Sequence, residues 1–450
     1  MLTKEPKLRD LLAIALPMVV SQASETIMLF VDRLFLSWLG KTYISAGMSG
    51  GLSAFVFMSI FTGTVGYVNA LSAQYYGAGE EKNCVNTVTQ GILLSLLFFP
   101  IALTFIPLVG KFFEISGHTP GQIELEYTYF RLLMLGGLLV LLRTVFASFF
   151  LGIGKTRIVM YSNLAGMVLN VPINYLLIFG KLGFPRLGIT GAAIGTLAGS
   201  FLITVILFSA FLKHKLYKSN RSKELWKINP IVMKKLMRFG MPAGVEMFLN
   251  VMAFNLFVQM FHSYSEDVAA AVTIAFNYDM VAFIPMLGLG FATTSMVGRY
   301  MGAGNPKGAE KTAGLAMKVG LFYASAMMLL FVFGAEGLVR VFTGGLAAGD
   351  TSVIPLAKTM LRLAAVYTIA DLIQLIMSGT LRGAGDTKWV MYISAALHWA
   401  MAGAAFLMIK VFVMNPVVVW MGFISFILIM GFTMFLRFKF GPWRKMKMID

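Results

Sequence analysis

Residues 75–87 read Tyr75-x-Gly77-Ala78-Gly79-x-x-Lys82-x-x-x-x-Thr87, and residues 300–312 read Tyr300-x-Gly302-Ala303-Gly304-x-x-Lys307-x-x-x-x-Thr312. The offset of 225 between these stretches also separates Pro17 from Pro242. A second pattern, Gly-x-Gly-x-Thr followed by a basic residue, occurs at 152–157 and again at 383–388, an offset of 231. The chain therefore consists of two halves of similar design. Duplicated membrane bundles with a central site between the halves are typical of secondary transporters.

The composition places both halves in a membrane. Hydrophobic residues make up 58% and charged residues 13%, whereas soluble proteins average about 25% charged residues. The apolar runs are continuous and lack the alternation of an outer-membrane barrel. Runs of about 20 or more weakly charged residues predict transmembrane helices. Twelve are expected, at 10–39, 44–77, 88–112, 122–150, 157–181, 189–212, 231–263, 268–301, 312–336, 353–381, 388–412 and 416–440.

The first apolar span could be mistaken for a signal peptide. It is too long for one and carries Glu25 and Asp32, so we interpret it as a retained helix. Cys84 is the only cysteine, which excludes an intramolecular disulfide.

The net charge of +17 is concentrated on one side of the predicted membrane. The linker after the sixth span is rich in lysine and arginine, and the loops at 155–157 and 307–311 and the tail at 437–447 fall on the same side. This is the positive-inside pattern. It predicts a multi-pass protein of the inner (plasma) membrane with both termini cytoplasmic. Since topology accounts for the charge, no nucleic-acid partner is expected.

Each half has six spans. Because this number is even, the second repeat begins on the same side of the membrane as the first. The repeats should then be related by a pseudo-two-fold axis along the membrane normal. We predict an N-lobe at 1–212, a basic cytoplasmic linker at 213–230 and a C-lobe at 231–450. The Gly-Ala-Gly motifs are interpreted as helix-end turns, where glycine adopts a positive φ.

Neither nucleotide hydrolysis nor another enzyme activity is supported by the motifs. Gly154-Lys155-Thr156 resembles the end of a phosphate-binding loop, but the first glycine of that loop would fall on Phe149. The four histidines show no metal-ligand spacing, and no Ser/His/Asp arrangement is present. No enzyme is therefore predicted.

Acidic residues inside the predicted spans are functional candidates, because each ionised group at mid-bilayer costs about 2.5–3.5 kcal/mol. Glu25 and Asp32 are two helical turns apart on one face, and Asp371 shares a face with Gln374. Each acid could instead form a local ion pair or a structural hydrogen bond, with Arg131, Arg143 and Arg362 as candidate partners. The candidate acids are Glu25, Asp32, Glu246, Asp279 and Asp371.

Amide side chains form a second group of candidates. Asn170 and Asn174 flank Pro172 in the span 157–181, and Asn250 follows Glu246 in the span 231–263. Amide oxygens can ligate a hard cation or orient a carboxylate. They can also hold helices together, which is the simpler interpretation for any one of them.

These residues resemble a known family. Thr26-Ile-Met-Leu-Phe-Val31-Asp32, Leu169-Asn170-Val-Pro172-Ile-Asn174 and Asp371-Leu-Ile-Gln374 resemble the multidrug and toxic compound extrusion (MATE) family, and its NorM-like branch is the most similar. The resemblance implies two six-helix lobes in a V, around a cavity that opens alternately to either side. It also implies export of cationic, often aromatic compounds in exchange for Na⁺ or H⁺. No further cofactor is expected, and we predict a monomer.

The family's first-helix and tenth-helix aspartates map onto Asp32 and Asp371. NorM-like members carry an acid where this chain has Asn250, and Glu246 lies one turn earlier. The resemblance thus implies a Na⁺ site near Asp371, Asn250 and Glu246. Asn174 stands where proton-coupled archaeal relatives have an aspartate, and Asp279 replaces a neutral residue.

One alternative keeps the same architecture. A lipid-linked oligosaccharide flippase of the same superfamily would need a cationic cavity to hold pyrophosphate, and the acids found here argue against it.

Overall fold

The computed structural model describes residues 5–115, 119–220, 226–343 and 353–449. All regular elements among these residues are helices. Eleven of the described helical segments are long and apolar enough to cross a membrane, and α6 (Pro120–Leu135) and α7 (Gly137–Gly152), bent by 46°, make a twelfth span together. The predicted all-helical membrane fold with twelve spans is confirmed.

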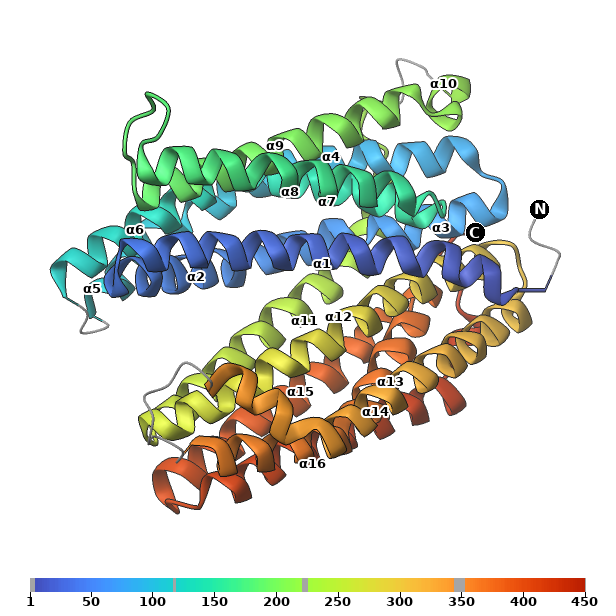
Figure 1. Cartoon of the computed structure of the whole chain (residues 1–450). Helices are drawn as coiled ribbons and strands as arrows, with labels where there is room; N and C mark the ends of the chain where they lie inside the picture. Colours follow the sequence, from blue (N-terminus) through green and yellow to red (C-terminus); the bar gives the residue numbers. More distant parts are fainter. Residues whose placement is uncertain (1–4, 116–118, 221–225, 344–352, 450) are drawn as a thin grey trace.

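The N-lobe contains the helices drawn from blue to green in Figure 1. They are α1 (Leu8–Leu39), α2 (Lys41–Gly66), α3 (Val68–Ala78), α4 (Glu81–Leu103), α5 (Phe105–Ile115), α6, α7, α8 (Thr156–Phe179) and α9 (Ile189–Lys213). The short helix α10 (Lys215–Asn220) begins the connection to the C-lobe. Residues 221–225 of the predicted basic linker lie outside the described residues.

The C-lobe contains the helices drawn from yellow-green to red. They are α11 (Pro230–His262), α12 (Glu266–Gly302), α13 (Pro306–Thr343), α14 (Val353–Ala384), α15 (Thr387–Phe406), η2 (Leu407–Val411), α16 (Pro416–Phe440) and η3 (Pro442–Lys445).

Several helix boundaries differ from the prediction. The span predicted at 44–77 is broken at Tyr67 into α2 and α3, and the span predicted at 312–336 runs from Pro306 to Thr343. The bend between α6 and α7 falls at Gly136 and Gly137. Glycine is a weak helix former, so a break costs least there. Hydropathy gives the apolar core of a span and not the polar turns at its ends.

Local chemistry explains where other helices begin and end. The Asn229 side chain accepts hydrogen bonds from Ile231 N and Val232 N at the start of α11. Gly79 and Gly304, the last glycines of the two Gly-Ala-Gly motifs, have φ of 79° and 68°. The predicted helix-end turns are confirmed at both positions.

The two lobes lie close together at the end that carries both termini, and spread apart toward the other end (Figure 1). There α2 packs against α11, and α12 packs against α1 and α3. A Cβ at Gly77 would overlap the backbone of Arg299, and a Cβ at Gly302 would overlap the backbone of Gln74. Both pairs are related by the offset of 225. The repeated motif therefore also builds a pseudo-symmetric contact between backbones, which we name the seam.

Hydrogen bonds cross the seam in both directions. Gln74 Nε2 donates to Gly383 O at 2.9 Å, and Ser295 Oγ donates to Leu151 O at 2.6 Å. The acceptors belong to the second pair of repeated motifs or lie next to it. All four motif copies therefore meet at this end of the molecule.

The C-terminal segment covers the same end. Trp443 is fully buried and donates through Nε1 to Phe438 O at 2.6 Å. Farther along, the Met448 Sδ accepts from the Tyr67 hydroxyl at 3.0 Å. The same hydroxyl lies 2.7 Å from Arg382 O. One tyrosine of the N-lobe thus contacts both the last helix turn of α14 and the C-terminal segment.

Candidate functional site

Asp32 is the most enclosed acid among the predicted candidates of α1, with 3% of its surface exposed. Thr196 Oγ1, on α9, donates to one carboxyl oxygen at 2.8 Å, and Asn174 Nδ2, on α8, donates to the other. Asn170, one turn before Asn174, faces the same carboxyl group. The structure therefore brings Asp32, Asn170 and Asn174 together, and adds Thr196.

Several polar atoms of this cluster remain unpaired. Asn170 is fully buried, yet neither of its amide atoms has a hydrogen-bond partner among the described residues. The same holds for Asn174 Oδ1. Buried polar groups almost always have partners. Two amide oxygens, a hydroxyl and a carboxylate are also the donor types that hard cations prefer.

Gly195 determines where the Asn174 amide lies. A Cβ at this position of α9 would overlap Asn174 Oδ1. Because only glycine leaves that space, α9 can approach α8 closely enough for Thr196 and Asn174 to reach the same carboxylate.

Glu25 belongs to a second polar network two turns away on α1. Asn163 Nδ2, on α8, donates to Glu25 at 2.9 Å and to Ser21 Oγ at 2.6 Å. Arg143, on α7, lies 3.7 Å from the Glu25 carboxylate. The prediction of Arg143 as an internal partner of an acid is confirmed. Glu25 is thus balanced by a cation, in contrast to Asp32, whose hydrogen-bond partners are neutral.

In the C-lobe, Asp371 on α14 lies beside Asp279 on α12. The buried hydroxyl of Tyr367, one turn before Asp371, faces both carboxyl groups. Both aspartates are partly exposed, and neighbouring carboxylates repel each other unless a proton or a cation lies between them. This pair can therefore hold a shared proton or a small cation. Gln374 lies on the next turn of α14 and is half-buried.

The structure does not bring Glu246 and Asn250 to Asp371. Glu246 is fully buried and receives a 2.7 Å charge-assisted hydrogen bond from Arg382. Asn250 donates to Ser394 Oγ at 2.7 Å. Arg382 is eleven residues beyond Asp371 on α14, about 16 Å along the helix axis. Glu246 and Asn250 therefore have partners of their own, whereas Asp279 lies beside Asp371; the Na⁺ site expected around Asp371, Asn250 and Glu246 stays a prediction.

Sequence reasoning missed four contributors: Thr196, Tyr367, Asn163 and Arg382. Each is polar and lies in an apolar helix, which was the available signal. Hydroxyl and amide groups are frequent in membrane helices, so that signal could not separate these from structural neighbours. Among the described residues, no three histidine, cysteine or acidic side chains form a metal-binding group.

The MatE family model matches residues 17–176 and again residues 242–401. The chain belongs to the MatE family. The two matched segments begin at Pro17 and Pro242, so each lobe matches the model separately and at the offset seen in the motifs. The resemblance to MATE transporters is confirmed.

MatE proteins that resemble this chain include two curated relatives. Multidrug resistance protein PmpM of Pseudomonas aeruginosa is 28% identical over 406 residues, covering 87% of this chain and 82% of the relative. A probable multidrug resistance protein NorM of Pasteurella multocida is 29% identical over 405 residues, covering 87% and 84%. A solved structure of a MOP superfamily transporter from Pyrococcus furiosus shares the MatE fold, with a TM-score of 0.87, 19% identity, and coverage of 99% of this chain and 98% of that one.

Proposed function

We propose that this chain is a secondary active multidrug efflux antiporter, which exports cationic and aromatic organic compounds in exchange for H⁺ or Na⁺. The observation that carries the proposal is Asp32, a buried membrane acid whose hydrogen-bond partners Asn174 and Thr196 are neutral. An intramembrane acid is costly and marks an ion or substrate path. The names of the two relatives, both multidrug resistance proteins, support multidrug export.

The two acid clusters suggest antiport by competition. A cationic substrate enters while the lobes are open to the cytoplasm, and the ionised carboxylates of Asp32 or of the Asp279 and Asp371 pair attract it. After the lobes rock, H⁺ or Na⁺ from outside neutralises the acid and the substrate leaves. Each net charge moved across the membrane adds about 2.3 kcal/mol per 100 mV.

The remaining expectations follow from topology and charge. The chain is proposed to lie in the inner (plasma) membrane as a monomer, with both termini and the basic linker in the cytoplasm. The end of the molecule that contains the seam also carries both termini, and this end is then cytoplasmic. The lobes as described are held together on that side.

The test is ethidium efflux from proteoliposomes, with Na⁺ and H⁺ gradients imposed separately. We expect one gradient to drive efflux and the double variant Asp32→Asn, Asp371→Asn to abolish it. Glu124→Gln, at an exposed acid of α6, is the matched control and should keep the parental rate. Unchanged efflux in the double variant would overturn the proposal.

The flippase alternative predicts a different result. A lipid-linked oligosaccharide flippase would give no ethidium efflux under either gradient while correctly inserted. The Arg143 and Arg382 cations that it could use for a pyrophosphate group are paired here with Glu25 and Glu246.

A further inference from the structure

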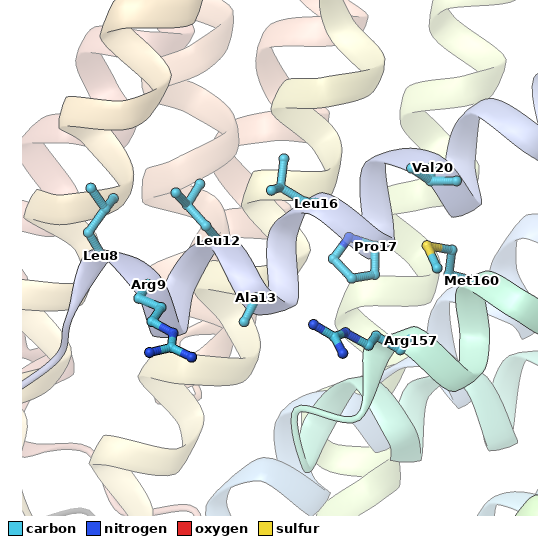
Figure 2. A pocket seen from close by; sticks show the side chains of 9 residues that line it. All are labelled: Leu8, Arg9, Leu12, Ala13, Leu16, Pro17, Val20, Arg157 and Met160. Atoms are coloured by element: carbon cyan, nitrogen blue, oxygen red, sulfur yellow. The ribbon is translucent and has the colours of Figure 1, made fainter.

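An open groove of about 710 Å³ lies between the first half of α1 and the start of α8, at the end of the molecule that carries the seam. Figure 2 shows its lining. Leu12, Leu16 and Val20 of α1 and Met160 of α8 contribute apolar side chains. Arg9 and Arg157 contribute the charged ones, and none of the described residues that line the groove is acidic.

The two guanidinium groups come from different helices and lie on either side of Ala13 in Figure 2, where Leu8, Leu12 and Leu16 point the opposite way. Both side chains are exposed. Neither forms an ion pair within 4.0 Å among the described residues. Asp10, the acid next to Arg9, instead lies close enough to Arg299 and Tyr300 of α12 to interact with them. The groove therefore holds two positive charges without a protein anion to balance them.

The length of the groove fits one membrane leaflet. From Leu8 to Val20, α1 rises about 18 Å. Half of the hydrocarbon core of a bilayer is about 15 Å. The guanidinium groups lie beside the part of α1 between Leu8 and Pro17, and the apolar lining continues to Val20 (Figure 2). An occupant with one anionic end and one apolar end matches both parts.

We propose that this groove binds one anionic phospholipid. Its phosphate would lie between Arg9 and Arg157, and an acyl chain would follow Leu12, Leu16 and Val20. Basic pockets between transmembrane helices on the cytoplasmic side bind such headgroups. The site goes beyond the proposed transport function, and only the assignment to the cytoplasmic leaflet rests on the proposed orientation.

The C-lobe supplies a matched control. At offsets of 225 and 231, Lys234 and Lys388 occupy the positions of Arg9 and Arg157, and Arg238 occupies that of Ala13. The C-lobe copy therefore carries three positive charges instead of two, and has the long Arg238 side chain where the N-lobe groove has the methyl group of Ala13. If the lipid site is specific to the N-lobe, substitutions in the N-lobe groove should weaken lipid binding and those in the C-lobe copy should not.

The experiment is native mass spectrometry of the intact chain with phosphatidylglycerol or phosphatidylcholine of identical acyl chains. We expect one phosphatidylglycerol to bind at least tenfold more tightly than phosphatidylcholine. Arg9→Gln, Arg157→Gln should weaken phosphatidylglycerol binding by roughly thirty-fold, which corresponds to about 2 kcal/mol. Lys234→Gln, Lys388→Gln should change it by less than about twofold, because that copy is not the bound site.

A second variant tests the groove without removing charge. Ala13→Phe fills the space between the two guanidinium groups and should weaken phosphatidylglycerol binding as strongly as the double arginine variant. Equal losses in the arginine and lysine doubles would overturn the proposal, since surface charge alone would then explain binding. The proposal would also be overturned if Ala13→Phe bound phosphatidylglycerol as tightly as the parent and inorganic phosphate displaced the lipid completely. The groove would then be a simple anion site. Lipid binding is measured without transport, so failure here leaves the antiport proposal unaffected.

Discussion

In the N-lobe, Asp32 lies among amide and hydroxyl groups, whereas in the C-lobe Asp279 and Asp371 lie beside each other with Tyr367. The repeat offsets place Phe257, and not an acid, at the position of Asp32. Phe257 is fully buried and stacks on Phe423 with ring centroids 4.7 Å apart. The duplicated backbone has kept its packing, while the acid chemistry has moved to different helices in each half.

The polar networks in the middle of the lobes differ in a similar way. Ser21, Glu25 and Asn163 of the N-lobe correspond by offset to Glu246, Asn250 and Ser394 of the C-lobe. The C-lobe acid, Glu246, lies one helical turn before the position that corresponds to Glu25. The arginines that pair with these acids, Arg143 and Arg382, are not related by the repeat offset. What the lobes still share is the seam, because both backbones must fit each other there.

The largest expected effect comes from breaking that shared seam. Gly302→Ala and Gly77→Ala each place a Cβ on the backbone of the opposite lobe. The lobes then cannot close at this end, so ethidium efflux should fall below about 1% of the parental rate, a loss of more than about 2.7 kcal/mol. The matched control is Gly314→Ala on α13, where a Cβ would meet nothing within 4 Å. Efflux above about half the parental rate in either seam variant would contradict a required close contact.

The next effect compares the two ion pairs. Arg382→Gln leaves Glu246, whose side chain is 1% exposed, without its cation and should destabilise the C-lobe by about 3 kcal/mol. Arg143→Gln acts on a 3.7 Å pair in which Glu25 is 35% exposed, and should cost less than about 1 kcal/mol. Thermal unfolding in detergent measures both. The double variant Glu246→Gln, Arg382→Gln should recover most of the stability lost in Arg382→Gln. Equal losses of stability in Arg382→Gln and Arg143→Gln would contradict the expected difference between the two ion pairs.

A smaller effect sharpens the description of the Asp32 site. Gly195→Ala pushes the Asn174 amide away from Asp32 and should lower the transport rate by about tenfold, or about 1.4 kcal/mol. Gly403→Ala, in α15 of the C-lobe, adds a Cβ that meets nothing within 4 Å and should have no effect. A parental rate in Gly195→Ala would mean that Asn174 is only a structural neighbour.

The smallest expected effect concerns one hydrogen bond of the seam. Ser295→Ala removes the bond to Leu151 O and should cost about 1 kcal/mol, or roughly a fivefold change in the ratio of closed to open molecules. Spin-label distances across the seam measure that ratio. Ser425→Ala is the control, because the Ser425 hydroxyl donates to Met421 O of its own helix and does not cross the seam. A ratio that does not change would exclude the bond as a contributor to closure.

Membrane class, helix number and internal duplication could be predicted from sequence. Each depends on local composition or on a repeated pattern, such as the Gly-Ala-Gly motifs whose helix-ending glycines have the expected positive φ. Asp32, Asn170 and Asn174 could each be named as candidates, because the resemblance mapped Asp32 and the two amides share one helix face, but their contact could not be predicted. Thr196 and Tyr367 could not be predicted as site residues, since a hydroxyl in an apolar helix has many structural explanations.

By itself, the sequence determined that two similar six-helix halves would form in a membrane, because apolar length and repeat spacing act along the chain. Only the tertiary structure decided which buried charges meet. Helix packing placed Asp279 beside Asp371 and paired Glu246 with Arg382. The Na⁺ site expected from the sequence contains both Glu246 and Asp371. It also placed two other glycines of the same motifs, Gly77 and Gly302, against the backbone of the opposite lobe. Contacts between residues some 100 to 300 positions apart depend on how helices pack in three dimensions, and side-chain periodicity carries no information about that.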